Sequence, residues 1–120
     1  MSGVIIVLSA IAALVLLAAG AQKILLRRSV TVPMRRLGAG DGLTRLIGFL
    51  ELAGASGLVA GNWLRPLAWA AVIGLMALLL GAIAYHLRAG DYRDGQHRTS
   101  AAAPVVLLAV VGSIAVLMSI

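Results

Sequence analysis

Residues 3–21, GVIIVLSAIAALVLLAAGA, indicate the fold class of this chain. This stretch contains no charged side chain, and as a helix it is about as long as the hydrocarbon core of a bilayer is thick, roughly 30 Å. A helix is compatible with the sequence as far as residue 26. Ala19-Gly20-Ala21 resembles a signal-peptide cleavage site, but no positive charge precedes the apolar run. We therefore interpret residues 3–26 as a transmembrane helix.

The composition extends this interpretation to the whole chain. Of 120 residues, 62% are hydrophobic and 12% charged, with a mean hydropathy of +1.06. Soluble domains are about half apolar and a quarter charged, so a water-soluble enzyme is excluded. Further apolar stretches cover about residues 43–61, 66–88 and 101–120. The sequence predicts an all-α fold, a transmembrane four-helix bundle that forms a single membrane domain over residues 1–120.

Local signals mark the ends of the predicted helices. Asp41 is placed to cap the second helix, and Pro66 lies at the start of the third, where its missing N–H costs nothing. Gly90 is expected to stop the third helix. Pro104 is expected in the first turn of the fourth helix.

The charged residues predict the orientation. There are ten Lys and Arg against four Asp and Glu, and nine of the ten lie in or beside the connections 27–42 and 89–100. By the positive-inside rule these connections face the cytoplasm, and both termini are extracytoplasmic. We expect a multi-pass protein of the bacterial cytoplasmic membrane. The counter-charge is expected to be anionic lipid headgroups and not nucleic acid.

The connection 27–42 has two interpretations. Val32, Pro33, Met34 and Leu37 among four arginines are typical of a short amphipathic turn on the inner membrane surface. A solvated basic loop that only sets the topology fits equally well.

Small residues recur on two of the predicted helices. Without a hydrophobic drive in lipid, close backbone approach makes helix packing favourable, and small residues permit it. We expect the glycines to hold one bundle together, or alternatively to form a dimerisation face through Gly57 and Gly61. The expected packing glycines are Gly48, Gly54, Gly57, Gly61, Gly74 and Gly81.

Glu51 is the one acidic residue inside a predicted span. It lies about 12 Å beyond Leu43 and so near the midplane, where an ionised carboxylate costs on the order of 2.5–3.5 kcal/mol. It should therefore face the bundle. Lys23 and His86 lie near the inner ends of their helices and can reach it.

These residues predict a polar pocket open toward the cytoplasmic leaflet. Gln22 and Tyr85 add neutral donors beside the three ionisable residues. The alternative is that Glu51 only fixes helix packing while Lys23 and His86 anchor helix ends at the interface. Two histidines and one intramembrane carboxylate are too few for a metal site. With no cysteine, the chain cannot carry thiol redox chemistry itself.

Four segments of the sequence resemble the DoxX-like family of membrane proteins. They are Gly20-Ala-Gln-Lys23-Ile-Leu, Ile47-Gly-Phe-Leu-Glu51-Leu-Ala-Gly-Ala-Ser-Gly-Leu, Pro66-Leu-Ala and Gly81-Ala-Ile-Ala-Tyr-His86-Leu-Arg-Ala-Gly-Asp91. In order, they are spread over residues 20–91, which is most of the chain. The resemblance implies a four-helix membrane bundle with Lys23, Glu51 and His86 as site residues. It also implies a link to membrane oxidoreductase systems, including thiosulfate–quinone oxidation and oxidative-stress complexes.

Three classes of function are consistent with the sequence. The first is an accessory bundle, not an enzyme by itself, that binds a quinone, a lipid or a membrane subunit through the pocket around Glu51. The second is a small proton-coupled transporter that relays a proton through Glu51 and His86 and works as a homo-oligomer. The third is a scaffold that docks a cytosolic enzyme through Arg35 and Arg36.

Overall fold

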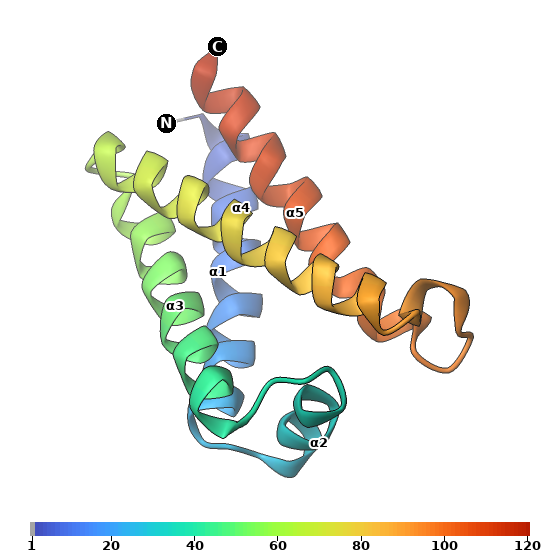
Figure 1. Cartoon of the computed structure of the whole chain (residues 1–120). Coiled ribbons are helices and arrows are strands. Elements are labelled where there is room, and N and C mark those ends of the chain that lie inside the picture. The colour runs from blue at the N-terminus through green and yellow to red at the C-terminus, as the bar shows by residue number, and fades with distance from the viewer. Residues whose placement is uncertain (1) are drawn as a thin grey trace.

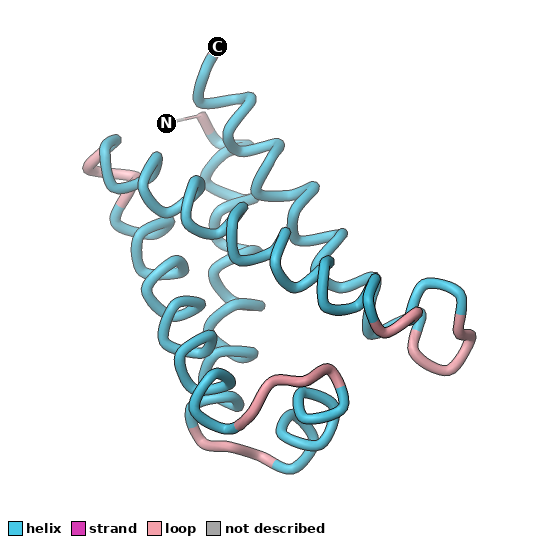
Figure 2. Tube along the Cα trace, viewed as in Figure 1, coloured by secondary structure: helices cyan, strands magenta, loops and turns pink. Residues whose placement is uncertain are grey.

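The structure, a computed structural model, describes residues 2–120, and these residues form helices joined by short connections (Figure 2). Four helices are long and apolar enough to cross a membrane: α1 (Gly3–Ile24), α3 (Asp41–Ala60), α4 (Arg65–Arg88) and α5 (Arg98–Ser119). Two shorter elements are α2 (Arg28–Arg36) and the 3₁₀ turn η1 (Asp91–Arg93). The predicted all-α bundle with four spans is confirmed.

The four long helices form a ring in which each contacts two neighbours. α1 packs on α3, α3 on α4, α4 on α5 and α5 on α1, while no Cα atoms of the diagonal pairs α1–α4 and α3–α5 lie within 8 Å of each other. Both termini and the turn 61–64 lie at one end, called the terminal end below (Figure 1). α2 and the segment 89–97 lie at the other, called the basic end.

The outer surface of the ring is apolar, as expected for a protein surrounded by lipid. Large side chains such as Leu14, Ile73 and Val106 are more than half exposed. The buried core is built from all four long helices and includes Leu16, Leu58, Val72 and Ile114. Each of the four spans thus exposes large apolar side chains as well as burying them.

Glycines set the two closest helix contacts of α3. Where α1 crosses α3, a Cβ on Gly48 would lie 2.8 Å from the carbonyl oxygen of Gly20. Nearer the terminal end, Gly54, Gly57 and Gly61 face α4, and a Cβ on any of them would collide with it. The α4 residues in these contacts are Leu75, Ala71 and Ala68 respectively.

This glycine pattern makes α3 and α4 diverge. The α3–α4 contact is tight only in the half of α3 that carries the three glycines. In the half nearer the basic end, the bulky residues Leu43, Ile47 and Leu50 line open space between the two helices. The helices accordingly separate toward the basic end, which Figure 1 shows as a V.

Two of the predicted packing glycines do not pack. Gly74 and Gly81 lie on the exposed side of α4, and a Cβ on either would meet no atom within 4 Å. Gly57 and Gly61, which were also considered as a dimerisation face, meet Ala71 and Ala68 of α4 inside the chain.

Two of the predicted helix starts differ in the structure. Gly40, and not Asp41, is the N-cap of α3, and the Asp41 carboxylate instead binds Arg35 at 2.9 Å. α5 begins at Arg98, so Pro104 lies inside the helix and not in its first turn. The carbonyl of Ser100 therefore receives no helical hydrogen bond from residue 104. Gly90 follows α4 with a φ of +74°, a left-handed conformation that ends the helix as predicted.

The connection 27–42 contains the nine-residue helix α2. Thr31 is buried and Met34 half-buried on one side, while Arg28, Arg35 and Arg36 are exposed on the other. The helix is thus amphipathic, as one of the two interpretations of this connection predicted. Gly38, with a φ of +93°, follows the helix and turns the chain back toward α3.

Candidate functional site

Lys23 and Glu51 form an ion pair inside the bundle. The Lys23 Nζ lies 2.5 Å from the Glu51 Oε1, and the two side chains are only 18% and 7% exposed. Each residue follows a glycine of the α1–α3 crossing by three positions, Lys23 after Gly20 and Glu51 after Gly48. Since residues three apart share one face of a helix, the crossing brings the two side chains together.

The Lys23 partner lowers the free-energy cost of placing the Glu51 carboxylate in a membrane span. An isolated charge at this depth would be expensive, but an ammonium partner at hydrogen-bond distance offsets much of the cost. As a unit, the pair is polar and has no net charge. The sequence predicted Lys23 and Glu51 as neighbours, and the structure brings them into direct contact.

A cavity of about 480 Å³ adjoins this pair, in the space where α3 and α4 diverge. Its volume lies within the range typical of small-molecule sites. The wall is mostly apolar and comes from α1, α3, α4 and α5 together with α2 and the segment that follows it. The lining residues are Val15, Ala19, Lys23, Met34, Leu37, Ala39, Leu43, Leu46, Ile47, Leu50, Glu51, Ala77, Leu78, Leu79, Gly81, Ala82, Tyr85, His86, Ser100, Ala103, Pro104 and Leu107.

The cavity is closed differently at its base and at its side. At the basic end, Met34, Leu37 and Ala39 form its floor, and Ala39 is almost fully buried. The wall is incomplete between α3 and α4, where the lining residues Leu46, Leu50 and Gly81 remain exposed, and the lining residues Val15 of α1 and Ala103 of α5 are exposed as well. On a membrane-spanning bundle this side faces acyl chains.

His86 lines the same cavity and is held by residues beyond the end of α4. Its Nδ1 lies 2.6 Å from the Asp91 Oδ2, and the Nη2 of Arg36 donates to the same oxygen at 2.7 Å. Asp91 is completely buried, and its other carboxylate oxygen has no hydrogen-bond partner within residues 2–120. The hydrogen bond from Arg36 holds the pKa of Asp91 below its ordinary value, with a further contribution from His86.

The two remaining predicted site residues are placed differently. Tyr85 lines the cavity beside His86, and the guanidinium of Arg88 lies 5.9 Å from the centre of its ring. Gln22 is exposed on α1 and does not line the cavity. Although Gln22 precedes Lys23, the step of about 100° per helical residue turns it away from α3.

Sequence reasoning missed Asp91 and the role of Arg36. Both were treated as parts of basic connections, whereas the structure joins them across 55 positions and attaches α2 to the end of α4. One signal was available: Asp91 follows a glycine stop and lies five residues after His86. No pattern in the sequence identified Arg36 as its partner.

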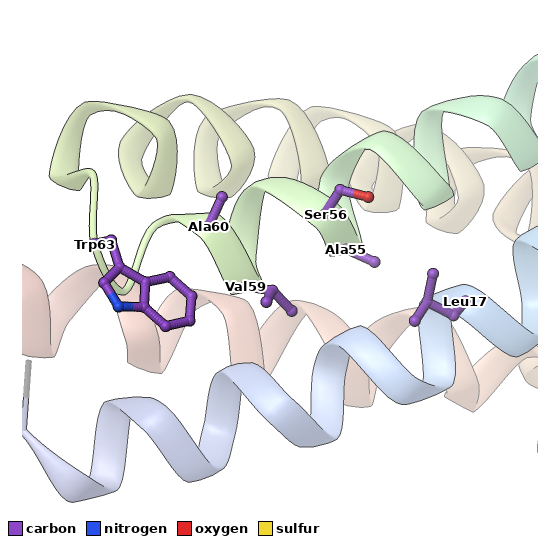
Figure 3. Close-up of a pocket in the computed structure, with 6 residues that line it drawn as sticks. All are labelled: Leu17, Ala55, Ser56, Val59, Ala60 and Trp63. Carbon is purple, nitrogen blue, oxygen red and sulfur yellow. The ribbon is translucent and has the colours of Figure 1, made fainter.

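A second hollow lies on the outer side of α1 and α3, nearer the terminal end (Figure 3). It is a shallow apolar groove of about 400 Å³ along Leu17, Ala55, Val59 and Trp63. Ser56, which also lines it, donates to the carbonyl of Leu52 in the same helix, and Trp63 carries an indole N–H. None of the predicted site residues lines this groove.

The four spans and their intramembrane ion pair define the class of this molecule, a small multi-pass membrane bundle. The model of the DoxX-like family matches residues 7–114, and the chain belongs to that family. No curated protein and no solved structure matches the chain. The family membership predicted from the Lys23, Glu51 and His86 segments is thus confirmed.

Proposed function

We propose that this protein binds an uncharged hydrophobic molecule with a polar head in the cavity beside Lys23 and Glu51. The observation that carries the proposal is the buried ion pair in a mostly apolar wall, since ligand sites combine apolar walls with a few fixed polar groups. The ammonium can donate to a carbonyl of the ligand, and the carboxylate can accept from a donor.

The charge balance favours a neutral head. Lys23 neutralises Glu51, and Arg36 neutralises Asp91. No unbalanced charge is thus left on these groups to offset the cost of burying an ionic headgroup. A quinone, with a neutral ring that bears carbonyl groups, fits this requirement better than an anionic phospholipid does.

The side opening determines how such a molecule would lie. Its head would contact the ion pair, while its tail would leave between α3 and α4, past Leu46 and Leu50. Met34, Leu37 and Ala39 cover the cavity toward the basic end. We propose that the protein is an accessory component of a membrane oxidoreductase or stress-response system in the bacterial cytoplasmic membrane, with its basic end at the inner leaflet near anionic headgroups.

A cavity-filling variant with a matched control tests the proposal. Ala82→Leu adds bulk to the wall of the cavity, whereas Ala84→Leu makes the same change on an exposed position of α4 outside it. Wild type and Ala84→Leu should bind decylubiquinone in detergent and should co-purify with the same hydrophobic molecule, detected by mass spectrometry. Ala82→Leu should do neither. If all three proteins retain only bulk lipid and bind the probe equally, the proposal is wrong.

No specific contact favours the two other functions that the sequence left open. A transporter of this size would need an oligomer, and the glycine face expected for it packs inside the chain. Docking of a cytosolic enzyme would use Arg35 and Arg36, whose guanidinium groups are already paired with Asp41 and Asp91.

A further inference from the structure

His86 is the one imidazole on the cavity wall. Its partner Asp91 determines which ring nitrogen donates a hydrogen bond and which accepts one. The Asp91 carboxylate lies within hydrogen-bond distance of Nδ1 and is kept ionised by Arg36. An ionised carboxylate accepts hydrogen bonds but cannot donate them, so the proton of the neutral imidazole must lie on Nδ1. The other ring nitrogen, Nε2, is then an acceptor.

This acceptor has no partner within residues 2–120. Three groups near it are already engaged: Arg36 binds Asp91, Lys23 binds Glu51, and the Tyr92 hydroxyl donates to the carbonyl of Ala101. Tyr92 also meets the His86 ring edge-on, with the ring centres 6.3 Å apart. An acceptor beside an apolar cavity gains most from an occupant that donates to it.

We propose that Nε2 of His86 accepts a hydrogen bond from a hydroxyl group on the ligand. The cavity then selects an amphiphile whose head carries a hydroxyl, such as a phenol or a hydroquinone, over the same molecule with that hydroxyl methylated. This inference rests on the proposed function, because it assigns a second contact for the same ligand. Lys23 and Glu51 would hold the head, and His86 would distinguish a donor from an acceptor.

Two probes of nearly equal size, 4-dodecylphenol and its methyl ether, test the donor requirement. At mildly alkaline pH in detergent, wild type should bind the phenol about five-fold more tightly than the ether, the factor that one hydrogen bond contributes. His86→Phe keeps an aromatic ring but removes the acceptor, and should bind the two probes equally.

The chain supplies a matched control. His97 pairs with Asp94 at 2.7 Å through the same ring nitrogen, but it lies in the segment before α5 and does not line the cavity. His97→Phe should keep the preference for the phenol. If His86→Phe keeps that preference as well, or if wild type binds both probes equally, the donor requirement is overturned while ligand binding in the cavity stands.

A measurement on the wild-type protein avoids any effect of the substitution on folding. With ¹⁵N-labelled histidine, the two imidazoles are assigned by comparison with His97→Phe. His86 should show a proton on Nδ1 and a bare Nε2, and the phenol but not the ether should shift the Nε2 resonance. A proton found on Nε2 would overturn the proposal. Failure of wild type to bind either probe would count against the proposed function itself.

Discussion

Gly20 of α1 and Gly48 of α3 cross so closely that neither position has room for a side chain. A Cβ on Gly48 would lie 2.9 Å from the Cβ of Lys23, and a Cβ on Gly20 would lie 3.3 Å from that of Glu51. The backbone crossing and the ion pair are therefore a single arrangement. Separation of the two helices at the glycines would also separate the charges.

Gly48→Ala should destabilise the protein by about 1–3 kcal/mol, the usual cost of overpacking. The helices must move apart, because the added methyl group meets backbone and not a flexible side-chain end. Gly74→Ala is the matched control: its Cβ meets open space and alanine favours the helix, so its stability should be unchanged or higher. Thermal unfolding in detergent measures both, and equal effects would contradict the close crossing.

The Lys23–Glu51 pair should show strong coupling in a double-mutant cycle. Lys23→Met leaves Glu51 buried without its partner and should cost about 3–5 kcal/mol. Glu51→Gln should cost less, because the long stem of Lys23 lets its ammonium swing toward the interface. The double variant should lose less stability than the sum of the two single variants, in denaturant unfolding. Additive losses would show that the two side chains do not interact.

Acid should weaken the attachment of α2 to α4 through Asp91. The pKa of Asp91 is lower in the folded protein than in the unfolded chain, so the carboxylate contributes stability above the unfolded value. That contribution is lost as the pH falls through the folded pKa. The difference in Tm between wild type and Asp91→Asn should be constant near neutral pH and shrink in acid. A difference that does not change with pH would contradict this assignment.

The orientation in the membrane can be tested with single-cysteine variants, because the chain has no cysteine of its own. Asn62→Cys places a thiol in the turn at the terminal end, and Gly95→Cys places one at the basic end. In intact cells, a membrane-impermeant maleimide should label Asn62→Cys and leave Gly95→Cys unlabelled until the cells are lysed. The reverse pattern would invert the topology and would break the positive-inside rule.

The fold was predictable from the sequence because hydropathy alone marks four spans. A carboxylate at the depth of Glu51 needs a partner, and the sequence offered Lys23 and His86 for that role. It did not show that Lys23 would bind Glu51 while His86 binds Asp91. The divergence of α3 and α4 was not predictable. Gly57 and Gly74 look alike in the sequence, yet one meets Ala71 and the other meets open space. Which side of a helix packs against another helix depends on how that helix is rotated about its own axis in the bundle.

The contacts at the basic end were the least predictable. Arg36 resembles any arginine of a basic connection, and only the course of α2 brings it to Asp91. Pro104 was misplaced because polar residues usually precede a span, whereas here α5 starts at Arg98 and includes them. Such pairings depend on how connections fold back over the bundle, which local patterns do not encode.

The gap between α3 and α4 has a consequence for how the cavity would be filled. A molecule dissolved in the bilayer could enter and leave sideways, by two-dimensional diffusion, without crossing either aqueous boundary. Its occupancy would then follow its mole fraction among the surrounding lipids and not its concentration in the cytoplasm. The fraction of protein molecules with an occupied cavity would therefore change with the composition of the surrounding membrane.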